Sequence, residues 1–244
     1  MARVCSPYSS NAYCRASVAL LPVASVENHG VLPLASDVLI ADCVVQRVKT
    51  SVEGADGIAI LPVIPYSVCV EHEPPRLGVR PSVFIEYLVD LLNEILAYTG
   101  SVVIAVFHGG AFHAAYIAAR YARRTTGRPV LVYSFWQVVE DTLQKRYGLK
   151  PGILHADPVE ASILLACGYK GSWLKEENID TVLSILHSSN HRTPIQPWIA
   201  EDVPGLYPDQ PVPASQELGE TLLEEAVAEL ISTIKTTAKK PPGG

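Results

Sequence analysis

The sequence predicts an α/β domain in which a mostly parallel central sheet is covered by helices on both faces, a three-layer sandwich. Three observations lead to this class. The 244 residues are 48% hydrophobic and 18% charged, enough apolar chain to bury a sizeable core. Short apolar runs alternate with helix-like segments, the order typical of parallel strands joined by crossover helices. The clearest strand-like run also lacks polar–apolar alternation, which indicates burial on both faces.

Four segments are expected to form the strands of this sheet. The runs SVALLPV and GIAILPV are short and apolar, and SVVIAVF is rich in β-branched residues. PVLVYS has the same character and leads directly into a helical pattern. The expected strands are therefore Ser17–Val23, Gly57–Val63, Ser101–Phe107 and Pro129–Ser134.

The helices are expected between and after these strands. In the first, Ile40, Ala41 and Val44 begin an apolar face at helical spacing. The second begins with a proline in its first turn, and the third is rich in alanine and ends before a glycine. The last is long and amphipathic. The expected helices are Asp37–Val48, Pro81–Ala97, Ala111–Arg124, Trp136–Tyr147, Pro158–Cys167 and Gln216–Thr237.

No repeat or Ser/Gly-rich linker divides the chain. We therefore expect one domain over residues 1–237, followed by a flexible tail at residues 238–244. The stretch Ser188–Pro213 contains six prolines, which exclude a regular helix. A loop of that length in a compact domain is usually functional or an interaction surface.

Charge and composition exclude several classes of protein. The 19 Lys and Arg against 25 Asp and Glu give a net charge of −6, and the basic residues cluster only at Arg120, Arg123 and Arg124, so nucleic-acid binding is not expected. No apolar run approaches the roughly 18–20 residues of a membrane helix, so no membrane association is expected. The amino-terminal residues also lack the long apolar segment of a signal peptide.

The five cysteines are odd in number, widely spaced and without a CxxC pair. This pattern predicts neither a disulfide framework nor a thiolate zinc site, and it favours a reducing, cytoplasmic setting. The cysteines are Cys5, Cys14, Cys43, Cys69 and Cys167.

Metal-competent side chains follow successive strands of the predicted sheet. In parallel sheets, ligands collect at the carboxyl ends of the strands. Each residue alone has an ordinary alternative, such as a solvated pair, a tight turn or a carboxylate at a helix start. Together they form an O/N ligand set suited to zinc, iron or manganese. The set comprises Glu27, His29, Asp37, His108 and Glu160, with Glu71, His72 and His155 nearby in similar positions.

Several motifs resemble those of the creatininase (creatinine amidohydrolase) superfamily, in order, over about residues 21–225. The segment ENHGVLPLASD resembles the signature E-x-H-G-x-x-L-P-x-x-T-D, and HADPVEAS resembles H-A-G-x-x-E-T-S. His108-Gly109-Gly110 resembles the centre of N-G-H-G-G-N. Glu71-His72 stands where the superfamily has an S-x-E-H loop, and the segment from Gly205 to Gly219 is similar to its carboxyl-terminal G-x-P…A…E-x-G stretch.

The Glu-Asn-His-Gly start looks most like the archaeal formamidopyrimidine deformylases. Those enzymes release formate from 2-amino-5-formylamino-6-ribosylaminopyrimidin-4(3H)-one 5′-phosphate, an early intermediate of riboflavin and deazaflavin biosynthesis. The resemblance implies a metal-dependent amidohydrolase that acts on a small-molecule amide, here a nucleotide. It also implies a homo-oligomer.

The resemblance also implies roles for individual residues. Glu27, Asp37 and His108 would hold one divalent ion, and His29, Asp37 and Glu160 a second, which gives one or two Fe²⁺, Zn²⁺ or Mn²⁺ ions per subunit. Water activated by the metals would attack the amide carbonyl. His155 would protonate the leaving nitrogen, and Glu160 would act beside it. The expected substrate-binding residues are His72, Arg76, Gly109 and Gly110.

The chain departs from the superfamily pattern at two places. The separation of Glu27 and Asp37 is one residue shorter, and both asparagines around His-Gly-Gly are replaced, by Val106 and Ala111. Two alternatives therefore stand beside the deformylase. One is a creatininase-like cyclic amidase or a peptide-trimming hydrolase. The other is a metal-binding scaffold that has lost its activity.

Overall fold

A four-stranded sheet forms the centre of the molecule in the computed structural model, which describes residues 16–53, 55, 57–149, 155–188, 207 and 209–238. Its strands are in the order β2-β1-β3-β4, and every ladder is parallel. The strands are β1 (Val18–Val23), β2 (Ile58–Ile60), β3 (Val102–Val106) and β4 (Val130–Ser134). The predicted α/β class with a mostly parallel sheet is confirmed.

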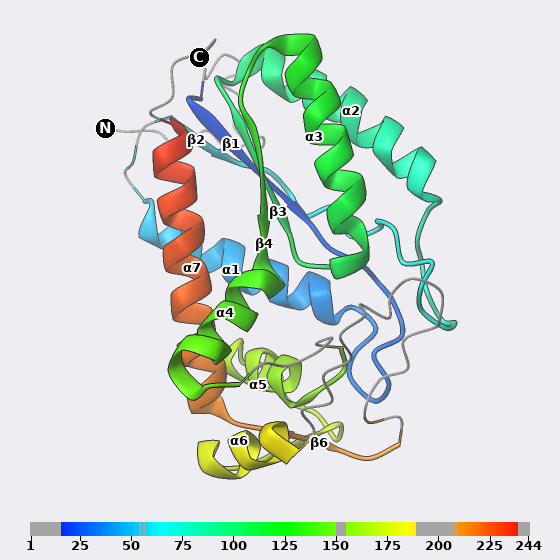
Figure 1. Cartoon of the computed structure of the whole chain (residues 1–244), viewed down its shortest axis with the longest axis vertical. Helices are drawn as coiled ribbons and strands as arrows, with labels where there is room; N and C mark the ends of the chain where they lie inside the picture. The colour runs from blue at the N-terminus through cyan, green and yellow to red at the C-terminus, as the bar shows by residue number, and fades with distance from the viewer. Residues whose placement is uncertain are drawn as a thin grey trace.

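Helices cover both faces of this sheet (Figure 1). On one face lie α2 (Pro81–Tyr98) and α3 (Phe112–Thr126). The other face carries α1 (Ser36–Ser51) and α7 (Gln216–Ala238), and α4 (Phe135–Tyr147) and α5 (Pro158–Ala166) pack against α7 beyond the ends of the strands (Figure 1). Each face has its own hydrophobic core, so the molecule has the three layers that the sequence predicts.

The central strand β3 shows why its sequence lacks alternation. Val103 and Ala105 belong to the core under α1 and α7, whereas Val102 and Ile104 belong to the core under α2 and α3. Both sets of side chains are fully buried. A strand covered on both faces has no position for a polar side chain, as the apolar run predicts.

Most predicted boundaries differ from the structure by one to three residues, and two of them lie next to the residues of the candidate site or at the end of a strand. Strand β2 ends at Ile60 rather than at Val63, although the backbone N–H of Leu61 still donates to the oxygen of Leu20. A 3₁₀ turn (Gly109–Ala111) precedes α3, so that helix begins at Phe112 rather than at Ala111.

A second, two-stranded sheet lies where the sequence predicts no strand. Parallel to β5 (Leu174–Glu176) runs β6 (Val212–Ala214), and α6 (Ile179–Ser188) follows β5. The expectation of an irregular loop up to Pro213 is therefore wrong at its end, since a proline is tolerated in a strand at a sheet edge. The remainder of that loop, at residues 189–206 and 208, lies outside the described residues, as does most of the expected tail.

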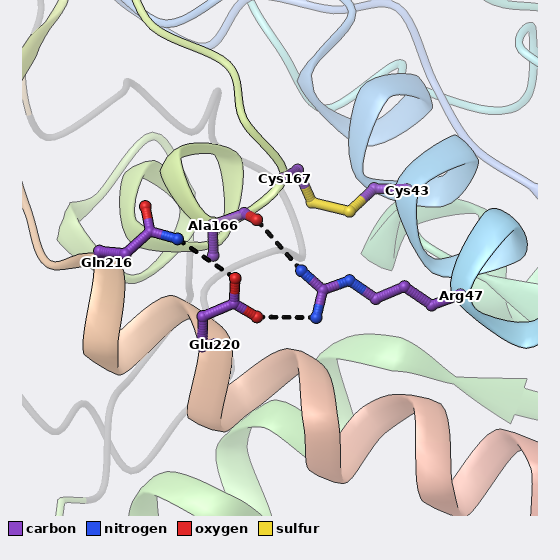
Figure 2. Close-up of a disulfide and its surroundings, with 6 residues drawn as sticks. All are labelled: Cys43, Arg47, Ala166, Cys167, Gln216 and Glu220. Atoms are coloured by element: carbon purple, nitrogen blue, oxygen red, sulfur yellow. Dashed lines mark hydrogen bonds and ion pairs between the residues drawn. A yellow bond between two sulfur atoms is a disulfide. The ribbon is translucent and has the colours of Figure 1, made fainter. Parts of the chain in front are cut away.

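One disulfide joins the first helix to the end of the fifth. Cys43 of α1 is bonded to Cys167, which follows α5, with a Cα–Cα distance of 5.8 Å (Figure 2). Beside it, Arg47 donates to the backbone oxygen of Ala166 and pairs with Glu220 of α7 at 2.7 Å. The expectation that the cysteines stay unpaired is wrong for these two, because 124 residues separate partners that helix packing brings together.

Helices α5 and α7 approach closely at a glycine that the sequence motif includes. A Cβ at Gly219 would lie 2.0 Å from the backbone oxygen of Ser162. Ser162 also accepts a hydrogen bond from the backbone of Ser215, just before α7. The motif glycine is thus explained by packing. None of the described helices is long and apolar enough to cross a bilayer.

Candidate metal centre

The predicted ligands converge at one edge of the central sheet. Glu27 and His29 follow β1, and His108 follows β3, so both segments leave the carboxyl ends of neighbouring parallel strands. Asp37 lies in the first turn of α1 and Glu160 in the first turn of α5. All five side chains are at most 4% exposed.

Four residues make up the first part of this cluster. The Oε1 atom of Glu27 is 3.1 Å from Nδ1 of His108 and 3.0 Å from Nε2 of His72. The same Nδ1 atom is 3.3 Å from Oδ2 of Asp37. Two ligand atoms that share one ion at about 2.0–2.2 Å lie about 3–3.5 Å apart, so these spacings fit a shared divalent ion.

The second part is centred on His29. Its Nε2 atom is 3.2 Å from Oε1 of Glu160 and 3.9 Å from Oδ1 of Asp37. It is also 4.0 Å from Oε1 of Glu27. Asp37 thus faces both histidines, so it could serve as a ligand in both parts of the cluster.

Hydrogen bonds with neighbouring groups hold three of these side chains. The ring Nδ1 of His29 lies 2.9 Å from the backbone oxygen of Glu27, so in the neutral ring the proton belongs on Nδ1, and Nε2 faces the carboxylates. Ser25 donates to Oδ2 of Asp37. The backbone N–H of Ala156 donates to Oε2 of Glu160, which leaves Oε1 facing the cluster.

The shorter Glu27–Asp37 segment still reaches the cluster because its loop closes tightly. Gly30 adopts a left-handed conformation (φ 59°), and the backbone of Leu32 bonds back to His29. The backbone N–H of Glu27 then bonds to the oxygen of Leu34. The positions of the two missing asparagines are apolar and buried in the core under α2 and α3.

The charges in the cluster shift the histidines toward their protonated form. Burial alone lowers the pKa of His29, but Glu160, Asp37 and Glu27 outweigh it and raise that pKa to about 10. Burial also lowers the pKa of His108, but Glu27 and Asp37 outweigh it and raise that pKa well above its usual value. The pKa of Glu27 is lowered, because its histidine partners outweigh burial. Without a metal, protonated His29 and His108 would therefore offset part of the charge of the carboxylates.

Unpaired buried atoms test whether the residues fit a metal. Oε2 of Glu27, Oε1 of Glu160 and Nδ1 of His72 are buried without a hydrogen-bond partner in the part of the chain that the structure describes. Such atoms are costly unless something else satisfies them. There are also three groups of residues among those described in which the ligand atoms of each group lie within 4.8 Å of one another. They are Glu27–His72–His108, Glu27–His29–His155 and His29–Asp37–Glu160. The donor set therefore fits divalent metal ions.

Metal binding is expected to release about two protons per fully loaded subunit near neutral pH, because His29 and His108 are protonated without metal and must be neutral to coordinate it. The apparent metal affinity should therefore rise with pH until the pKa of His29, about 10, is passed. Isothermal titration of Mn²⁺ into metal-free protein, in buffers of different ionisation enthalpy, measures the proton count. Heats that do not depend on the buffer would contradict this assignment.

The other residues singled out in the sequence lie around the cluster. Nε2 of His155 is 2.9 Å from the backbone oxygen of Asn28, and its ring lies beside those of His29 and His72. Burial, then His29, lower the pKa of His155 to about 4. Asp157 caps α5 by accepting from two backbone N–H groups, which is the ordinary alternative for a carboxylate there.

Two residues of one loop are closer to the cluster than the sequence predicts. His72, expected only to bind substrate, contacts Glu27 directly. The sequence predicts no specific role for Glu71, yet its Oε1 is 3.2 Å from Nε2 of His108. The Glu-His motif was the available signal. Arg76 is exposed, and its guanidinium donates to the backbone oxygen of His72.

A cavity of about 480 Å³ adjoins the cluster at Glu71, Gly109 and Gly110. Its walls are mainly apolar side chains from α2, α3 and the loop before α2. The other lining residues are Val68, Val70, Pro81, Ile85, His113, Ala114 and Ile117. Among the described residues that line it there is no lysine or arginine.

Solved structures share this architecture. A creatininase variant complexed with creatine is 20% identical, with a TM-score of 0.65, and the match covers 91% of this chain and 92% of that one. A structure described as "Creatininase Mn" is 20% identical, with a TM-score of 0.63, and the match covers 91% of each chain. A putative creatinine amidohydrolase from Bacteroides fragilis NCTC 9343 is 18% identical, with a TM-score of 0.63. That match covers 93% of this chain and 91% of the other.

A comparison with curated protein sequences gives no significant match. The model of the Creatininase family, described as creatinine amidohydrolase, matches residues 7–234, which is most of the chain. The structural likeness by itself establishes the fold, while the family model spans every predicted ligand. The chain therefore belongs to the creatinine amidohydrolase family of metal-dependent amidohydrolases.

Proposed function

We propose that this protein hydrolyses the C–N bond of a small-molecule amide with one or two divalent metal ions bound per subunit. The observation that carries the proposal is the convergence of Glu27, Asp37 and Glu160 on the buried imidazoles of His29 and His108. Creatininase structures are described with Mn and as a Zn–Zn type, which supports a divalent ion. Fe²⁺, Zn²⁺ and Mn²⁺ are the candidates for such a ligand set.

Two groups of residues would hold the ions. Glu27, Asp37 and His108 would bind the first, with His72 as a further ligand, and His29, Asp37 and Glu160 would bind the second. A divalent ion there would lower the pKa of a water molecule and polarise a carbonyl oxygen. Because the ligands are buried, few water molecules compete with the substrate amide.

His155 is the residue proposed to move the proton. Hydrolysis adds water to the carbonyl carbon, breaks the C–N bond and needs a proton on the leaving nitrogen, since an amide anion is a poor leaving group. The His155 ring lies 4.6 Å from that of His29, and its hydrogen bond to Asn28 fixes its orientation. A neutral ring at this place can take the proton from the attacking water and return it to the nitrogen.

Replacing His155 with glutamine is expected to lower kcat by about 100-fold or more, the range typical of a lost acid–base group, while metal content stays unchanged. Metal analysis and steady-state kinetics on the same preparation measure both quantities. The matched control is His187→Gln, an exposed histidine of α6. A loss of metal in His155→Gln would instead make His155 a ligand, as its grouping with Glu27 and His29 allows.

The finer proposal is that the substrate is the formylamino-pyrimidine ribonucleotide and that the products are formate and the amine, a step of riboflavin or deazaflavin biosynthesis. The Glu-Asn-His-Gly segment supports it. Arg76 is exposed and contacts the backbone of His72 beside the cluster, and a guanidinium can bind a phosphate with two hydrogen bonds. Arg80 is exposed in the same loop. Gly109 and Gly110 leave backbone exposed beside the cavity.

One observation favours a second candidate, a creatininase-like hydrolysis of a cyclic amide. The cavity beside the cluster is mostly apolar, and no described lysine or arginine lines it. Such a pocket suits a small uncharged or cationic substrate better than a phosphate. The solved creatininase bound to creatine is a member of the same family with this fold.

Assays of the metal-loaded protein with both substrates test the proposal. Formate release from the nucleotide supports the deformylase, and ring opening of creatinine supports the cyclic amidase. Metal binding without turnover of either, or of a panel of small amides and dipeptides, would refute amide hydrolysis and leave a metal-binding scaffold.

A further inference from the structure

Gly110 leaves a space beside the metal centre that the side chain of Glu71 fills. A Cβ built on Gly110 would lie 1.5 Å from Oε1 of Glu71 and 2.6 Å from Nε2 of His108. Any side chain at residue 110 would thus have to displace the glutamate. The absence of a side chain at residue 110 therefore makes room for the carboxylate of Glu71.

This contact lies on the far side of the His108 ring from the other carboxylates. Nδ1 faces Glu27 and Asp37 at 3.1 and 3.3 Å, whereas Nε2 faces Oε1 of Glu71 at 3.2 Å. Nε2 is buried and meets no well-aligned hydrogen-bond acceptor among the described residues, so this carboxylate is the group placed to accept its proton.

We propose that Glu71 is the positioning residue of the metal centre: it orients His108 with the proton on Nε2 and the lone pair of Nδ1 toward the metal, in the space that Gly110 leaves free. Histidine ligands typically donate their second N–H to a carboxylate or a carbonyl, which fixes the tautomer and the ring orientation. His29 uses a backbone oxygen for this purpose. The proposal rests on the proposed metal-dependent function.

The position of Glu71 gives the contact a second consequence. Its side chain is 16% exposed and lines the 480 Å³ cavity, while its neighbour His72 contacts Glu27. The loop that carries both residues therefore holds one wall of the metal centre and one wall of the cavity. A substrate in the cavity would meet the carboxylate that orients a metal ligand.

Binding of Mn²⁺ to the metal-free full chain, measured by calorimetry, tests the proposal. Glu71→Ala is expected to lower the affinity about 10- to 100-fold, as removal of such an outer partner typically does. Glu71→Gln keeps an oxygen that can accept the proton, so it should lose less than Glu71→Ala. The matched control is Glu73→Ala, an exposed glutamate two residues further along the same loop, which should bind as the wild type does.

Gly110→Ala provides a second route to the same contact. Its methyl group should push the carboxylate away and crowd Nε2, so the affinity should fall at least as far as in Glu71→Ala. Adding Glu71→Ala to that variant should then change the affinity less than twofold, because the contact is already broken. The thermal midpoints of the metal-free variants should match that of the wild type.

The proposal is overturned if Glu71→Ala binds Mn²⁺ as tightly as the wild type does, if its loss of affinity follows a loss of folding, or if the wild type binds no Mn²⁺. Wild-type protein that binds Mn²⁺ but hydrolyses no amide would refute the proposed function and leave the role of Glu71 standing. The two failures are therefore distinguishable.

Discussion

Replacing Glu27 with alanine is expected to abolish metal binding and amide hydrolysis together. Glu27 belongs to two of the three groups of ligand atoms, and its Oε1 contacts both His72 and His108 within 3.1 Å. Without it, those imidazoles lose the carboxylate that faces them. Since removal of an outer partner already costs about 10- to 100-fold in metal affinity, the loss of a direct ligand should exceed about 100-fold.

Metal analysis after dialysis and an assay with whichever of the two proposed substrates the wild type hydrolyses measure this loss. The control is Glu86→Ala on the exposed face of α2, which should change neither quantity. Unchanged metal content in Glu27→Ala would contradict the ligand assignment. Unchanged activity with lower metal content would separate the metal from the chemistry.

Removing the disulfide is expected to lower the free energy of unfolding by about 2–5 kcal/mol. The bond closes a loop between residues 124 apart in sequence, and in the chain-entropy model a loop of this size restricts the unfolded chain by about 5 kcal/mol. It joins α1, which carries Asp37, to the end of α5, which carries Glu160. Urea denaturation of Cys43→Ala/Cys167→Ala and of wild type, without reductant, measures the difference.

Two comparisons isolate the disulfide. A reductant should destabilise the wild type and leave the double variant unchanged. Arg47→Ala removes the neighbouring contacts to Ala166 and Glu220 (Figure 2), and it should cost only about 1 kcal/mol, because that ion pair is about one-third exposed. Equal stability of wild type and double variant would show that the cross-link adds nothing.

The sequence alone determined the fold class and most of the candidate site. Apolar runs without alternation placed the strands of a parallel sheet, because residues buried on both faces must be apolar. Polar residues directly after those runs then had to meet at one edge of the sheet. Glu27, His29 and His108 were predicted in this way, and both imidazoles lie within about 4 Å of the Glu27 carboxylate.

Contacts between residues far apart in the sequence were decided only by the tertiary structure. Glu71 contacts His108 because the loop before α2 folds across the His-Gly-Gly turn. The hydrophobic periodicity of the sequence carries no information about the distance between these two segments. Cys43 and Cys167 likewise look unrelated until α1 and α5 pack together. Periodicity reports the burial of each residue along its own element, whereas the partner across a packed interface is fixed by the mutual position of the elements.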